Sequence, residues 1–212
     1  IPGFHDAGAR DAALVAALRD APGGVRRVAA LLADRQARLR DRHLHRWGAD
    51  RTRWPVRVTH NDAKLNNVLF DPAVRALGVI DLDTVMPADL YVEIGDLLRA
   101  LAWPGAEDAA IARARPAPVP VLAALGAFLD AHGFHGDTAA DPGTLASAPA
   151  FMAWMLGTRF LTDHLEGNRV FPVRDPEQNL RRAAVQFDLC EGLLALGPAI
   201  AACCRASGPH PE

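Results

Sequence analysis

Apolar residues recur at intervals of three and four positions over most of this chain, which is the spacing of one face of an α-helix. In the second such stretch, Val28, Leu31, Leu32 and Leu39 share a face, and arginines occupy most of the remaining surface. The periodicity predicts helices over residues 7–20, 26–47, 89–102, 118–132, 146–166 and 176–206. The chain is therefore expected to be mainly helical.

Turn and capping residues mark the ends of these helices. Residues 22–24 (Pro-Gly-Gly) separate the first two, and the proline-rich residues 116–120 are typical of a connector. The last helix has a strong start signal: Asp175 as the cap, Pro176 at the first position and Gln178 at the third.

A different pattern occupies the middle of the chain, where short runs of Val, Leu and Ile are bounded by Asp and Pro. These runs predict buried strands at 56–59, 67–70 and 77–81, and a turn at 71–72 joins the last two into a hairpin. The polar window 60–66 lies between the first two strands. Polar residues gathered on a loop between buried strands indicate a functional site.

Composition narrows the function classes. The chain has 212 residues, half of them hydrophobic, and a formal net charge of −2, so it can build one core of ordinary size and carries no overall basic field that would attract nucleic acid. The three cysteines are odd in number and form no CxxC pair, which favours a reducing, cytoplasmic setting over a disulfide framework. We expect no membrane span and no secretory leader.

The polar window and the hairpin together carry the residues that phosphoryl transfer requires. Asp62 can accept a proton from an attacking hydroxyl, and Lys64 can stabilise charge on the moving phosphoryl group. Asn67 and Asp81 supply the hard oxygen ligands that Mg²⁺ prefers, and the hairpin places both at one end. The imidazole of His60 would then hold the loop against the backbone near Asp81.

A metal-dependent hydrolase is an alternative interpretation of the same segment. Its ligands would be His60, Asp62, Asp81 and Asp83. A further well-spaced ligand would be needed, and the His43-x-His45 pair does not provide it, because residues two apart on a helix point in different directions.

The spacing Asp62-x-Lys64-x-x-Asn67 matches the catalytic loop of protein kinases. The wider pattern resembles the aminoglycoside phosphotransferase and choline kinase superfamily, and within it the N-acetylhexosamine 1-kinase-like branch. Four segments carry this resemblance, namely residues 1–6, 60–67 with Asp71, 79–87 and 159–167. The element Asn179-Leu180-x-Arg182 with Gln186 also fits.

The resemblance implies an enzyme that moves the γ-phosphoryl of ATP to a hydroxyl of a small molecule, such as an N-acetylhexosamine, with Mg²⁺ as cofactor. It assigns Asp62 as the base, Asn67 and Asp81 as metal ligands, and His60 as the loop anchor. Asp83 would be an extra carboxylate for metal or sugar.

Two residues of the fifth helix, Arg159 and Asp163, would face the sugar pocket by the same resemblance. The equally weighted interpretation is that they form a helix cap or ion pair.

The sequence departs from the branch at several positions, which are Ala63, Ala88, Glu93, Ile94 and Asn168. Glu93-Ile94 stands where Asp-Phe is usual. A glycine-rich phosphate loop is not found.

The expected fold is therefore α+β and mainly α: the C-terminal lobe of a protein-kinase-like fold, with a short catalytic β-hairpin and the N-terminal nucleotide lobe absent. Residues 1–212 would form this single lobe, with 56–87 as the catalytic loop and metal hairpin and 88–212 as a helical substrate subdomain. We expect little activity from this chain alone. A fragment that only binds substrate is the alternative.

Overall fold

The computed structural model describes residues 3–48, 54, 56–103, 116–132 and 141–206. It contains six α-helices and four short strands within these ranges. The helices are α1 (Ala7–Asp20), α2 (Gly23–Leu39), α3 (Leu90–Ala102), α4 (Pro118–His132), α5 (Pro142–Leu165) and α6 (Gln178–Ala206). The strands are β1 (Val56–Thr59), β2 (Val68–Phe70), β3 (Ala76–Val79) and β4 (Met86–Asp89). This confirms the prediction of a mainly helical α+β chain.

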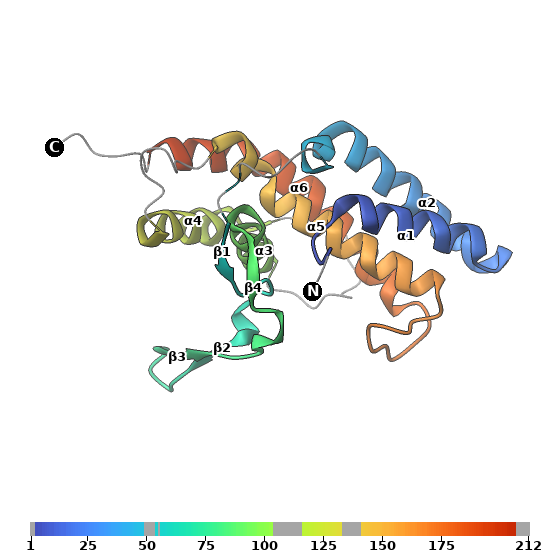
Figure 1. The fold of residues 1–212 in the computed structure, drawn as a ribbon, viewed down its shortest axis with the longest axis horizontal. Helices are drawn as coiled ribbons and strands as arrows, with labels where there is room; N and C mark the ends of the chain where they lie inside the picture. The colour runs from blue at the N-terminus through green and yellow to red at the C-terminus, as the bar shows by residue number, and fades with distance from the viewer. Residues whose placement is uncertain (1–2, 49–53, 55, 104–115, 133–140, 207–212) are drawn as a thin grey trace.

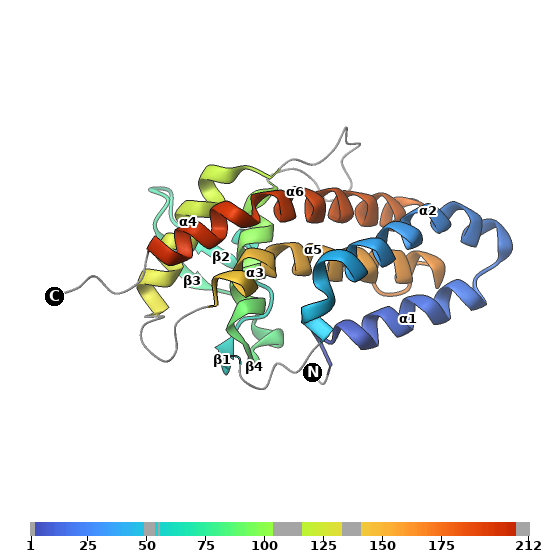
Figure 2. The same ribbon diagram turned by 90° about the horizontal axis from the view of Figure 1, so that it is seen from above.

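Helices α5 and α6 run side by side through the centre of the molecule, and the other helices pack around them (Figures 1 and 2). The indole of Trp47 stacks on Phe151 of α5 at a centroid distance of 4.1 Å and donates a hydrogen bond to Ser147. Trp154 donates to the carbonyl of Gln36 at the inner face of α2. These contacts join the N-terminal third of the chain to α5.

Glycine allows α3 to approach α5 unusually closely. A Cβ atom at Gly95 would lie 2.8 Å from the carbonyl oxygen of Ala148, which is closer than real side chains come. The helix that begins three residues after Pro87 is thereby held tightly against the central pair.

Each of the two sheets has two antiparallel strands. β2 pairs with β3 through the turn predicted at residues 71–72, and β1 pairs with β4. The second pairing was missed, because residues beyond Pro87 were expected to be helical. Pro87 is accommodated opposite Val58 in a two-stranded sheet, where a missing N–H is tolerated.

The remaining differences lie at element ends. α2 begins at Gly23 and α5 at Pro142, each earlier than predicted, and the chain after Leu39 continues as a π turn and a 3₁₀ turn. α6 begins at Gln178 and not at residue 176. The Asp175 carboxylate accepts a hydrogen bond from the backbone N–H of Glu177 within the turn that precedes the helix.

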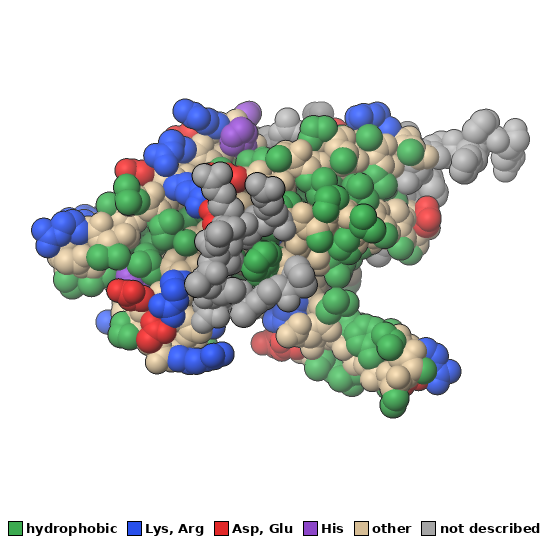
Figure 3. All heavy atoms as spheres, turned by 180° about the vertical axis from the view of Figure 1, so that it is seen from behind, with side chains coloured by type: hydrophobic (Ala, Val, Ile, Leu, Met, Phe, Trp, Pro, Cys, Tyr) green, Lys and Arg blue, Asp and Glu red, His purple; other side chains and the backbone are tan. Residues whose placement is uncertain are grey.

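The β2–β3 hairpin projects from the helical body, and its apolar side chains are exposed (Figure 3). The exposed side chains on it and beside it are Leu69, Phe70, Val74, Leu77, Val79 and Ile80. This overturns the expectation that these strands would be buried: their Val, Leu and Ile residues have no layer packed over them among the described residues.

By length and apolar composition alone, α6 could cross a membrane, which differs from the expectation that no segment reaches that length. A core helix of a soluble protein passes the same test. In this structure α6 packs along α5 and buries Phe187, Leu189 and Leu193.

Candidate active site

The polar loop between β1 and β2 is fastened to the segment that follows β3. The imidazole Nε2 of His60 lies 2.8 Å from the carbonyl oxygen of Ile80, next to Asp81. The hydroxyl of Thr84 donates a hydrogen bond of 2.7 Å to the carbonyl of His60. The contact expected of His60 as a loop anchor is therefore present.

Asn61 takes a left-handed backbone conformation, with φ at 63°, and turns the loop sharply. Its buried amide donates to the carbonyls of Thr59 and Thr84, each at 3.1 Å. Asparagine tolerates this region better than most residues because its short side chain bonds to nearby backbone.

A carboxylate on α3 holds the same turn from the other side. Glu93 accepts hydrogen bonds from the backbone N–H of His60 at 3.0 Å and from that of Asn61 at 2.8 Å, one on each oxygen. In the sequence, Glu93 stands out only as a departure from the branch. Its position in the first turn of the helix that follows the hairpin could have suggested that its carboxylate faces the loop. The neighbouring residues, however, do not specify which loop groups it would bind.

The side chain of Asp62 is held at one oxygen. Its Oδ2 accepts from Lys64 Nζ at 2.6 Å and from Asn67 Nδ2 at 3.0 Å. Across the described ranges, no donor contacts Oδ1, and 29% of the side chain is exposed. The carboxylate is therefore oriented by the protein and still has one oxygen available for an incoming hydroxyl.

Asn67 and Asp81 lie at one end of the hairpin, as the spacing predicted. The backbone N–H of Ile80 donates to the carbonyl of Asn67 at 2.9 Å, and the next pair in register is Val68 with Val79. The Asn67 amide N–H₂ group bonds to Asp62, which leaves its Oδ1 as the oxygen that can bind a cation. Asp81 is exposed and has a left-handed backbone, with φ at 63°.

This donor set fits magnesium, which binds one or two protein oxygens and completes its shell with phosphates and water. In the part of the chain that the structure describes, no group of three or more His, Cys, Asp or Glu residues could hold a metal. The acidic cluster that the hydrolase interpretation requires is accordingly not found there.

A cavity of about 380 Å³ opens beside Asp62. The catalytic loop, α3, α5, α6 and three further segments, at residues 4–5, 84 and 171–172, form its walls. Its lining residues are Phe4, His5, Asn61, Asp62, Lys64, Thr84, Asp96, Arg99, Met152, Met155, Leu156, Arg159, Phe160, Phe171, Pro172 and Arg182. The mixture of apolar side chains and a few charged groups is typical of a small-molecule site.

Of the three residues suggested for substrate binding, only Arg159 lines this cavity. Asp83 is exposed outside it. Asp163 is buried, and its carboxylate accepts hydrogen bonds from the side chain of Asn179 and from three backbone N–H groups of residues 169–171. These contacts fasten the loop after α5 to the helix.

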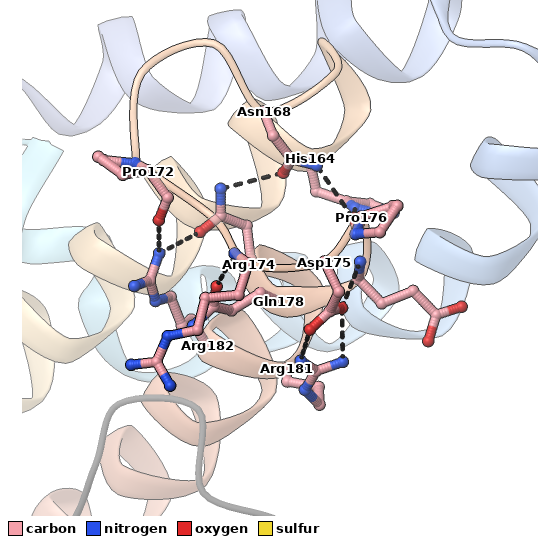
Figure 4. Close-up of polar contacts among 11 residues, drawn as sticks. His164, Asn168, Pro172, Arg174, Asp175, Pro176, Gln178, Arg181 and Arg182 are labelled. Atoms are coloured by element: carbon pink, nitrogen blue, oxygen red, sulfur yellow. Dashed lines mark hydrogen bonds and ion pairs between the residues drawn. The ribbon is translucent and has the colours of Figure 1, made fainter.

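Phe171 and Pro172 of that loop line the cavity, and polar contacts fasten the loop to the start of α6 (Figure 4). Asn179 donates to Asn168, and Arg182 donates to the carbonyl of Pro172 at 3.0 Å and to the side-chain oxygen of Asn179 at 2.9 Å. A second set of contacts fixes its far end, where Asp175 pairs with Arg181. The Asn179 and Arg182 positions singled out in the sequence thus shape the cavity wall.

Residues 3–128 match the model of the phosphotransferase enzyme family. This match spans more than half of the chain and includes the catalytic loop, the hairpin and α3. The chain therefore belongs to the phosphotransferase enzyme family.

Proposed function

We propose that this protein is an ATP-dependent kinase that transfers the γ-phosphoryl of ATP to a hydroxyl of a small molecule, with a sugar such as an N-acetylhexosamine as the acceptor. The observation that carries this proposal is the state of Asp62. One carboxylate oxygen is held by Lys64 and Asn67, and the other is available at a cavity of small-molecule size.

In this proposal the acceptor hydroxyl donates its proton toward Asp62 Oδ1 as it attacks the phosphorus. The hydrogen bond from Asn67 and the ion pair with Lys64 keep the carboxylate in one orientation, so that the hydroxyl is aligned before the reaction. His60 and Glu93 hold the loop backbone that carries Asp62.

Asn67 Oδ1 and Asp81 are the residues that would hold Mg²⁺, which supplies neutralisation of the triphosphate charge. Lys64 would contribute a further positive charge close to the transferred group. Its ammonium lies 2.6 Å from Asp62, so that its positive charge is close to the base and to the phosphoryl group that the base would act beside.

The test is the substitution Asp62→Asn, assayed by ATP-dependent phosphorylation of N-acetylhexosamines. Loss of a general base lowers turnover by about 100- to 10,000-fold. Asp20→Asn is the matched control, because Asp20 is exposed on α1 and pairs only with the neighbouring Arg19 in the described structure. Turnover of Asp62→Asn close to that of the unsubstituted protein would refute the assignment.

A further inference from the structure

The charged groups that line the cavity do not balance. Lys64 is paired with Asp62 at 2.6 Å, and Arg99 is paired with Asp96 at 2.8 Å. Arg159 and Arg182 add two more positive charges, and the lining contains no further carboxylate. The wall facing the acceptor therefore carries an excess of positive charge.

Arg159 is the most unusual of these cations. It is half-buried, and it forms no ion pair or hydrogen bond with any residue that the structure describes. Its guanidinium carbon lies 5.4 Å from the ring centre of Phe4 and 5.1 Å from that of Phe171. These cation–π contacts replace part of the lost hydration, but they use none of the five N–H donors.

A second arginine raises the free-energy cost of keeping Arg159 charged at this place. Burial lowers the pKa of Arg159, and the positive charge of the nearby Arg10 lowers it further, whereas the charges of Asp62 and Asp96 oppose this shift. The Nε of Arg10 is itself buried without a hydrogen-bond partner in the described part of the chain. Neither of these two guanidinium groups forms an ion pair with a residue that the structure describes, and this favours an anion beside Arg159.

Arg182 adds to the same field from α6. Its guanidinium carbon lies 5.4 Å from the ring centre of Phe160, and it donates hydrogen bonds to the neutral oxygens of Pro172 and Asn179. These contacts hold the arginine at the cavity wall.

We infer that the acceptor carries an anionic group, a carboxylate or a phosphate monoester, in addition to the hydroxyl that is phosphorylated, and that Arg159 binds this group. The inference rests on the proposed kinase function and specifies its acceptor class. A planar guanidinium binds either anion through two parallel hydrogen bonds, which a neutral sugar cannot match. The same charge disfavours acceptors that carry protonated amines.

The experiment measures binding by calorimetry with three probes that share one ring: N-acetylglucosamine, its 6-phosphate and its 6-carboxylate. We expect at least one anionic probe to bind about tenfold to a hundredfold more tightly than the neutral sugar, the size of a charge-assisted hydrogen-bond pair. The phosphate and carboxylate arms identify which anion is preferred. Equal binding of all three probes would overturn the inference.

Arg159→Gln should bring the anionic and neutral probes to within about twofold of each other, whereas Arg159→Lys should keep part of the preference. Arg169→Gln is the matched control, since Arg169 is exposed on the nearby loop and does not line the cavity. An anion preference that survives Arg159→Gln would exclude Arg159 as the binding residue.

Ionic strength gives a measurement that needs no variant. Anion binding to the unsubstituted protein should weaken as salt rises, while binding of the neutral sugar should not. A salt-independent preference contradicts the inference even if Arg159→Gln fails to fold. If the protein binds anions but shows no Asp62-dependent phosphorylation, this inference stands and the kinase function is rejected. If it phosphorylates sugars without preferring the anionic probes, the kinase function stands and this inference is rejected.

Discussion

Glu93 offers the sharpest test of how the catalytic loop is positioned. It lies on α3, outside the loop, and its two oxygens accept the backbone N–H groups of His60 and Asn61. These amides immediately precede Asp62, so that their orientation sets the direction of the base. Replacing Glu93 by glutamine keeps the size of the side chain and changes one acceptor oxygen into a donor.

The magnitude follows from the two hydrogen bonds. In Glu93→Gln, one N–H keeps an acceptor, although the bond loses its charge assistance, and the other N–H faces a donor. An unsatisfied buried donor costs about 1–3 kcal/mol, and the weaker remaining bond costs about 1 kcal/mol more. Because Glu93 is only half-buried, we expect a loss near the lower end, about 2 kcal/mol of unfolding free energy.

The assays are urea unfolding and turnover on the same preparations. A loss of about 2 kcal/mol corresponds to roughly 4–8 °C in Tm for a domain of this size. Turnover should fall by about 100-fold, since small displacements of a catalytic group have effects of that order. Glu93→Asp, which keeps the charge but shortens the side chain, should lie between Glu93→Gln and the unsubstituted protein.

Glu177→Gln is the matched control, because it makes the same chemical change at an exposed side chain of the loop before α6. It should change stability by less than about 0.5 kcal/mol and leave turnover unaltered. If Glu93→Gln matches this control in both assays, the carboxylate does not position the loop, and the argument from its two hydrogen bonds is wrong.

Three further predictions concern the metal site, the helix packing and the hairpin turn. Asp81→Ala should weaken Mg²⁺-dependent binding of an ATP analogue more than Asn67→Ala does, because it removes a charge as well as a ligand. Calorimetric magnesium titration measures this difference. Unchanged binding by Asp81→Ala would exclude Asp81 from the metal site. Gly95→Ala should lower the free energy of unfolding by about 1–3 kcal/mol. Gly126→Ala, where an added Cβ meets open space, should instead stabilise α4 by about 0.5–1 kcal/mol. Urea midpoints that shift in the same direction for both variants would contradict this. Val74→Asn should stabilise the protein by about 1 kcal/mol, because the exposed, β-branched Val74 has a left-handed backbone, with φ at 62°. Thermal unfolding measures this change, and a lower Tm would show that the turn is not strained.

Much of the secondary structure could be predicted from local pattern. The first helix and the first strand have the predicted bounds, and the hairpin turn lies where expected. These features depend on periodicity, caps and turn residues that lie within a few positions of one another. The starts of α2 and α5 were predicted too late, because their first turns consist largely of glycine, proline and other small residues. Such residues carry no hydrophobic periodicity from which a helix can be predicted.

In the candidate site, too, local spacing predicted one part and the structure added another. Asp62, Lys64 and Asn67 lie within six consecutive residues, so that their spacing alone indicates one constellation. The structure adds the contacts among them, in which Lys64 and Asn67 share one oxygen of Asp62. Their roles in phosphoryl transfer remain the prediction that the Asp62→Asn assay tests.

Only the tertiary structure decided the partners that lie far apart in the sequence. Glu93 reaches back more than 30 positions to the loop amides, and β4 pairs with β1 across a similar interval. The same packing leaves Arg159 without a carboxylate partner among the described residues and surrounds Asp163 with backbone donors. A local pattern records which groups a residue carries and where its helix turns, whereas burial and pairing depend on which distant segment packs against it, and that is determined by the fold as a whole.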